Sequence, residues 1–195
     1  LDKVLIANRG EIACRVIKTA RKMGIKTVAV YSDADKNALH VDMADEAIHI
    51  GPPPANQSYI VMEKILDAIK TSGADAVHPG YGFLSENPEF AKALDKAGIT
   101  FIGPNPHAIE AMGDKITSKK LAAEAGVSTV PGYMGLIADA DEAVKISNDI
   151  GYPVMIKASA GGGGKGMRIA WNDEEAREGF QSSKNEAANS FGDDR

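Results

Sequence analysis

Two lysines flank a run of four consecutive glycines in the segment 157–167. Each glycine inside a regular element costs about 0.5–1 kcal/mol relative to alanine, so four in a row are unfavourable in a packed strand or helix. A bare backbone can instead wrap around a phosphate chain and direct its N–H groups at the oxygens. The ammonium groups of Lys157 and Lys165 add positive charge for the same anion. The pattern predicts a nucleotide-phosphate loop, formed by Gly161, Gly162, Gly163, Gly164, Lys165 and Gly166.

A flexible linker is the competing interpretation of this glycine run. Linkers usually lie between polar segments, whereas apolar residues stand on both sides here, at 153–156 and at 167–171. We therefore expect two strands of a hairpin joined by the glycine loop. Gly166 stands where a Walker A motif has Ser or Thr, so the loop is not that of GTPases and related enzymes.

Two other segments carry residues with chemical potential. The loop 78–87 follows a predicted parallel strand, which is where open α/β sheets bind ligands. His78 in this loop could act as an acid or base, but a hydrogen bond to backbone in a tightly packed loop is the favoured interpretation. Lys115 opens a predicted helix and opposes its dipole. Such local inconsistencies are more frequent at functional sites, although a merely exposed lysine is the alternative.

The elements that must position these residues begin with alternating strands and helices. We expect strands near 4–7, 27–30, 47–50, 74–77 and 99–102 and helices near 12–24, 59–70 and 89–97. The inward positions of the first helix are Ile12, Val16, Ile17, Ala20 and Met23, with Cys14 in the same core stripe; those of the second are Ile60, Ile65, Leu66 and Ile69. This order indicates an α/β fold with a parallel, doubly wound sheet.

A dinucleotide site at the first strand is disfavoured. Asp33 lies where an acid could bind a ribose hydroxyl. The turn at 8–11, however, has one glycine where the fingerprint has three, and Glu11 stands where a pyrophosphate would approach. Glu11 is better explained as a favourable partner of the helix dipole.

The pattern changes at the Gly-Pro-Asn-Pro sequence of 103–106, where we place the first domain boundary. Helices are expected near 108–112 and 115–125, and a break follows at 130–132. A smaller α/β unit then contains a helix near 141–150, the glycine hairpin and a last helix capped by Asn172, with Glu175 as its reciprocal partner. Because this unit has only two strands, we expect the chain to be part of a longer protein.

Composition excludes several classes of function. The net charge of −5 gives a nucleic-acid partner no overall electrostatic support. No apolar run reaches the 18 or more residues of a membrane span, and no signal-peptide pattern is present. The four histidines are scattered and the one cysteine has no partner, so neither a metal-ligand cluster nor a disulfide framework is predicted.

Four segments in order, 7–13, 78–87, 112–115 and 151–167, together resemble the biotin carboxylase part of biotin-dependent carboxylases. The residues at 167–171 and 191–195 are most similar to the α chains of propionyl-CoA carboxylases. Acetyl-CoA, methylcrotonyl-CoA and pyruvate carboxylases share the core motifs. Another ATP-grasp ligase and a non-catalytic nucleotide-binding module remain the alternatives.

The resemblance implies an ATP-grasp fold with a Rossmann-like pre-ATP-grasp domain at 1–103, a helical linker at 104–130 and an incomplete lid subdomain at 131–195. It implies that Lys115 and Lys157 contact ATP phosphates, that 161–166 cover them and that Met167 lies near the adenine. A dimer face would include Arg15, Lys18 and Lys22.

The reaction implied by the resemblance uses ATP with Mg²⁺ or Mn²⁺ to activate bicarbonate and then carboxylates biotin held on a carrier domain. The implied partners are that biotin carboxyl carrier domain, a carboxyltransferase subunit and a second copy in a homodimer or larger assembly, without nucleic acid or membrane. The catalytic, metal, bicarbonate and biotin residues would lie after Arg195, so the segment alone should be inactive. The implied compartment is the cytoplasm of a bacterium or the mitochondrial matrix.

Overall fold

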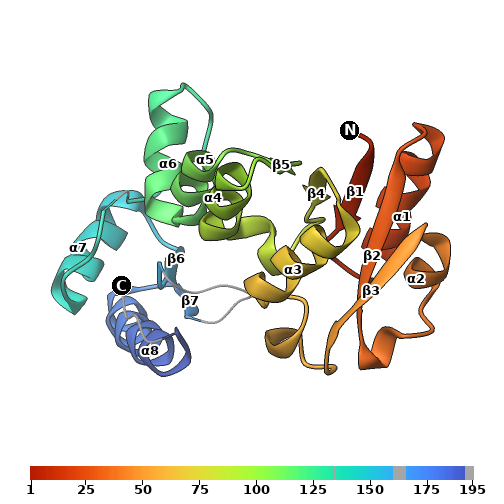
Figure 1. Ribbon diagram of the computed structural model, residues 1–195. Helices are drawn as coiled ribbons and strands as arrows, with labels where there is room; N and C mark the ends of the chain where they lie inside the picture. The colour runs from red at the N-terminus through yellow and green to blue at the C-terminus, as the bar shows by residue number, and fades with distance from the viewer. Residues whose placement is uncertain (134, 160–165, 192–195) are drawn as a thin grey trace. The chain divides into compact units, whose positions relative to one another are not determined.

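The computed structural model describes residues 1–133, 135–159 and 166–191, and it divides into two compact units (Figure 1). Unit 1 comprises Leu1–Glu110 and unit 2 comprises Ala111–Arg195. The division falls a few residues after the 103–106 segment, where the sequence changes pattern.

Unit 1 is built on a five-stranded parallel sheet with the order β3-β2-β1-β4-β5. The strands are β1 (Lys3–Ile6), β2 (Lys26–Ser32), β3 (Glu46–Gly51), β4 (Ala76–His78) and β5 (Thr100–Phe101). Between them lie α1 (Gly10–Lys22), α2 (Leu39–Met43), α3 (Met62–Ser72) and α4 (Pro88–Lys96). The predicted parallel, doubly wound sheet is confirmed.

Helices cover both faces of this sheet. Side chains alternate along each strand, so neighbouring residues of one strand can be buried on opposite faces. Leu5 and Val28 belong to a large buried cluster with Ile65 of α3 and Phe90 of α4. Ile6 points to the opposite face and packs with Ala13 and Ile17 of α1 and with Met43 of α2. The strands buried on both faces therefore read as continuous apolar runs, as the sequence shows.

Several details of the predicted helices are wrong. α3 begins at Met62 rather than Tyr59, because a short 3₁₀ turn at Ala55–Gln57 precedes it and Tyr59 is buried before the helix starts. Ile60 is 42% exposed instead of inward. Met23 is 68% exposed, since it caps α1 where the chain turns through Gly24. Cys14 is only half-buried and is not part of the core.

Unit 2 contains α6 (Lys115–Glu124), α7 (Ala140–Ile150), β6 (Val154–Lys157), β7 (Met167–Ala170) and α8 (Asp173–Phe191), while α5 (Pro106–Gly113) runs across the division. β6 and β7 pair antiparallel, which confirms the hairpin, and α8 packs against both strands and α7. The Asn172 side chain caps α8 by accepting from the Glu175 N–H at 2.9 Å. Glu175 accepts from Trp171 N–H, one residue before the predicted reciprocal position.

Candidate nucleotide-phosphate site

Asp114 fixes the start of α6 and thereby the position of Lys115. Its carboxylate accepts hydrogen bonds from the Ile116 N–H at 3.4 Å and from the Thr117 hydroxyl at 2.8 Å. A carboxylate at this cap satisfies N–H groups that the first helical turn leaves without partners. Lys115 is consequently held as the first residue of the helix.

The hairpin brings the two flanks of the glycine run together. Lys157 is the register partner of Met167, and the Ala158 N–H donates to the Gly166 carbonyl oxygen at 2.9 Å. Gly166 has φ of +72°, and a Cβ atom there would lie 2.9 Å from the Ala158 Cβ. Gly166 is thus required by both the backbone conformation and the space at the base of the loop.

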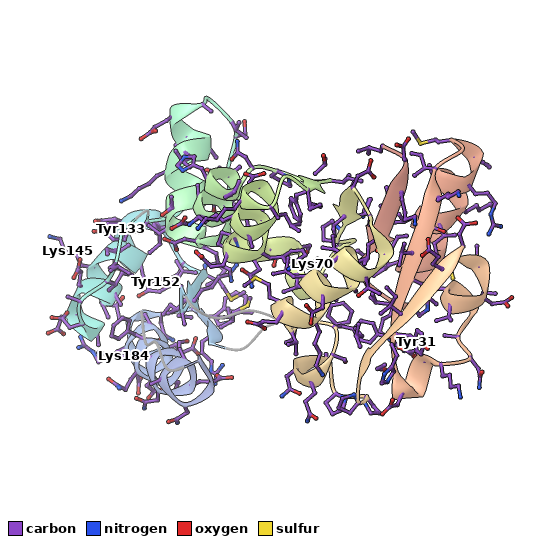
Figure 2. All side chains as sticks on the ribbon, in the orientation of Figure 1. Tyr31, Lys70, Tyr133, Lys145, Tyr152 and Lys184 are labelled. Atoms are coloured by element: carbon purple, nitrogen blue, oxygen red, sulfur yellow. The ribbon has the colours of Figure 1, made fainter. Side chains whose placement is uncertain are left out.

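A cavity of about 870 Å³ lies within unit 2. It is lined by α6, the segment between α6 and α7, α7, β6 and α8. Lys115 and Lys157 both line it, together with Lys119, Lys184 and Tyr133. Figure 2 labels Lys184 on α8 and Tyr133 in the segment between α6 and α7. Four lysine side chains in the wall of one largely apolar cavity suit a ligand with an apolar body and a negatively charged end.

The remaining residues predicted for the site are placed differently. Gly166 and Met167 lie at the base of the hairpin and are not among the residues that line the cavity. Gly161, Gly162, Gly163, Gly164 and Lys165 lie outside the described residues. The candidate dimer residues Arg15, Lys18 and Lys22 belong to α1 in unit 1, where all three are exposed.

A second, smaller hollow of about 330 Å³ lies in unit 1, where β1 and β4 end. Its walls are the 8–12 and 81–83 segments. Asn8 ties them together, because its buried side-chain amide donates to the carbonyl oxygens of Pro79 and Tyr81 at 2.9 and 2.8 Å. The predicted position of the second loop, at the carboxyl end of a parallel strand, is confirmed.

An ion pair joins the segment that follows β1 to the segment that follows β2. Arg9 donates from Nε and a terminal nitrogen to the two carboxylate oxygens of Asp35, each at 2.6 Å. The Tyr59 hydroxyl donates to the same carboxylate. Hydrogen bonding to the Arg9 guanidinium lowers the pKa of Asp35 to about 2 against the opposing effect of burial, and raises the pKa of Arg9. Asp33, the acid considered for a ribose, pairs instead with His49.

This Arg9–Asp35–Tyr59 network was not predicted. Arg9 lies in a turn, and its partners follow 26 and 50 residues later, so no local pattern joins them. The alternation of strands and helices was the one available signal, because it brings the ends of β1 and β2 to one edge of the sheet.

His78 takes the structural role that the sequence favoured. Its Nδ1 accepts a hydrogen bond from the Gly80 N–H at 3.0 Å, and burial lowers the pKa of the imidazole. The neutral ring therefore carries its proton on Nε2. Among residues 1–133, 135–159 and 166–191, no group of three or more acidic, histidine or cysteine side chains could hold a metal ion. None of the helices in those ranges combines the length and the apolar character needed to cross a membrane.

Comparison with known families gives two matches that divide the chain. Residues 1–109 match the family described as biotin carboxylase, N-terminal domain. Residues 114–195 match the family described as carbamoyl-phosphate synthase L chain, ATP binding domain. The second match covers the cavity, the hairpin and α8.

Similar proteins agree with these matches. The propionyl-CoA carboxylase alpha chain of Ruegeria pomeroyi is 82% identical over the whole chain, and the mitochondrial human protein is 66% identical. The chain spans only 28% and 27% of these relatives' lengths. A biotin carboxylase complex with β-γ-ATP from Campylobacter jejuni has a TM-score of 0.92 at 45% identity, covering 98% of this chain and 43% of that one.

A further structure is the biotin carboxylase domain dimer of the 2-oxoglutarate carboxylase from Hydrogenobacter thermophilus, solved with MgADP, ADP and bicarbonate. It has a TM-score of 0.89 at 52% identity, covering 98% of this chain and 42% of that one. The parallel sheet, the glycine hairpin and these matches agree, and the chain belongs to the biotin carboxylase family as its N-terminal domain and the first part of its ATP-binding domain.

Proposed function

We propose that the protein containing this chain carboxylates carrier-bound biotin with bicarbonate and ATP, as the biotin carboxylase component of a propionyl-CoA carboxylase. The observation that carries the proposal is the placement of Lys115 and Lys157 in the wall of one cavity beside the glycine hairpin. The 82% identity to a propionyl-CoA carboxylase alpha chain supports this acyl-CoA over acetyl-CoA, methylcrotonyl-CoA or pyruvate as acceptor.

In this proposal the two lysines bind the phosphates of MgATP. Their fixed charges would offset the charge on the transferring phosphoryl group and on the leaving ADP, which is the main requirement of phosphoryl transfer. Residues 161–166 would cover the phosphates with backbone N–H groups, and Met167 would lie near the adenine. Residues beyond this chain would supply the metal ligands and the groups that bind bicarbonate and biotin.

The proposed domain roles follow the same division. Residues 1–103 would act as the pre-ATP-grasp scaffold, 104–130 as the linker and 131–195 as part of the lid subdomain. The proposed partners are a biotin carboxyl carrier domain, a carboxyltransferase subunit and a second copy bound through Arg15, Lys18 and Lys22. Relatives are both bacterial and mitochondrial, so either compartment suits the proposal.

The test is an assay of ADP release by the full-length protein. We expect release to require bicarbonate and biotin, and the complete complex to prefer propionyl-CoA as acceptor. ADP release that depends on neither bicarbonate nor biotin would instead indicate another ATP-grasp ligase. A calorimetric titration with MgATP that yields no heat would indicate a non-catalytic module.

A further inference from the structure

Arg168 on β7 connects the backbone of the hairpin to α8. One terminal nitrogen of its guanidinium donates to the Met167 carbonyl oxygen at 2.7 Å. The other forms an ion pair with the Glu186 Oε2 atom of α8 at 2.6 Å. That carboxylate oxygen is buried and has no hydrogen-bond partner, so the ion pair with Arg168 is its compensating contact, although the Arg168 side chain as a whole is partly exposed. Because Arg168 contacts both groups at once, Glu186 orients the guanidinium that holds the Met167 carbonyl.

The close packing of α8 against the hairpin allows Arg168 and Glu186 to meet. A Cβ atom on Gly179 would lie 3.3 Å from the Arg168 Cβ and 3.5 Å from the Ile156 Cδ1, so α8 approaches both strands closely at that turn. Glu186 follows Gly179 by seven residues, two helical turns later on the same face. The Glu186 carboxylate therefore lies within reach of Arg168 on β7.

The peptide group held by Arg168 belongs to the residue paired with Lys157. Met167 and Lys157 are opposite each other in the two-stranded ladder, and the neighbouring Ala158 N–H bonds to Gly166. A change in the orientation of the Met167 carbonyl would disturb this ladder at its last pair before the glycine run. Lys157 lines the cavity, whereas Arg168 and Glu186 are not among its lining residues.

We propose that Arg168 and Glu186 are positioning residues for nucleotide binding, which set the hairpin backbone so that the Lys157 ammonium faces the phosphates. This inference rests on the proposed function, because it takes the cavity ligand to be MgATP. Neither side chain is assigned any contact with the nucleotide itself. Loss of either should weaken nucleotide binding more than it slows the chemical step.

The experiment uses the full-length protein and steady-state kinetics with MgATP as the varied substrate. We expect Arg168→Met to raise the KM for MgATP about fivefold or more and to lower kcat by a smaller factor, less than Lys157→Ala does. Arg168→Lys should give an intermediate KM, since a single ammonium cannot reproduce the forked contact. The double variant Arg168→Met with Glu186→Gln should be no worse than Arg168→Met, because Glu186 acts through Arg168.

A matched control is the ion pair between Arg177 and Asp141, which also involves α8 but joins it to α7 and not to a strand. Arg177→Met should leave the KM for MgATP unchanged. An unchanged KM in Arg168→Met, or an equal rise in Arg177→Met, would overturn the inference. If Arg168→Met does not fold, Glu186→Gln alone decides by the same criterion. A wild-type protein that does not bind MgATP would refute the proposed function and this inference together, whereas normal wild-type binding confines any failure to the inference.

Discussion

Lys157 lies directly opposite Met167 in the antiparallel ladder of the β6–β7 hairpin. The pair closes the base of the glycine-rich segment, next to the hydrogen bond from the Ala158 N–H to the Gly166 carbonyl oxygen. Because this pairing is regular, the residues on the two sides of the glycine run are held next to each other at the end of the hairpin. The point at which the Lys157 side chain leaves β6 is therefore set by strand geometry.

Lys157→Ala should raise the KM for MgATP and lower turnover in the full-length protein, because a phosphate-binding charge is removed from the cavity wall. We expect a loss in kcat/KM of about tenfold or more. Steady-state kinetics measure it, with Lys145→Ala as the control, since Lys145 is an exposed residue of α7 outside the cavity lining. Equal kinetics for the two variants would remove Lys157 from the site.

Gly166→Ala should destabilise the hairpin. The substitution places a Cβ atom 2.9 Å from the Ala158 Cβ in a residue with φ of +72°. A left-handed conformation costs a non-glycine residue about 1–2 kcal/mol, before any cost of the close contact. Hydrogen exchange should show faster exchange of the Ala158 amide, and Gly151→Ala, where a Cβ meets open space although φ is also positive, is the control for backbone strain alone. Unaltered protection of Ala158 would contradict this account.

Asp114→Ala should disturb the start of α6 and with it Lys115. The substitution removes the acceptor for the Ile116 N–H and the Thr117 hydroxyl, and loss of an N-cap typically costs about 1 kcal/mol. We expect a higher KM for MgATP, with Asp114→Asn close to wild type because an amide oxygen can still cap. Equal effects of the two substitutions would show that the charge, and not the cap, is what matters.

The Asp35 carboxylate should contribute stability that depends on pH. Its pKa is lowered from 3.8 to about 2 in the folded chain, so the contribution is complete above pH 4 and is lost as the pH falls toward 2. The shift corresponds to at most about 2 kcal/mol. Hydrogen exchange of the Ser32 amide, which donates to the Tyr59 hydroxyl, reports this network locally. In Asp35→Asn, protection should be lower at neutral pH and should no longer change between pH 4 and pH 2.

The 195-residue segment by itself should show no ADP release that depends on bicarbonate and biotin. It spans about a quarter of the length of the relatives it matches. The full-length protein assayed in parallel is the control. Bicarbonate- and biotin-dependent turnover by the segment would contradict the expectation that the catalytic residues follow Arg195.

The sequence predicts the parallel sheet of unit 1 and the hairpin of unit 2 because their patterns are local. Buried strands such as β1 and β2 are short apolar runs, and glycine stands where the chain turns back. The start of α3 could not be found this way, because Tyr59 is apolar enough to extend the helical pattern but is buried to hydrogen-bond with Asp35. Its partner lies 24 residues away, beyond any local rule.

The candidate site shows the same limit. Lys115 and Lys157 are conspicuous in the sequence because each breaks or borders a regular pattern, and both line the cavity. Arg168 and Glu186 do not stand out in the sequence, because an arginine in a strand and a glutamate in a helix interrupt no pattern. Their relationship depends on the close approach of α8 at Gly179, which is a property of packing and not of spacing.

The hairpin of unit 2 has a practical consequence for work with this segment. Within the described residues β6 and β7 pair only with each other, so the outer edge of each strand has no strand partner, although the Met167 carbonyl oxygen already accepts from Arg168. Met155 and Ile169, which face each other across the ladder, are each about half exposed, at 47% and 57%. Bare strand edges beside apolar side chains promote self-association between molecules. Expressed alone, the segment should precipitate more readily than the full-length protein.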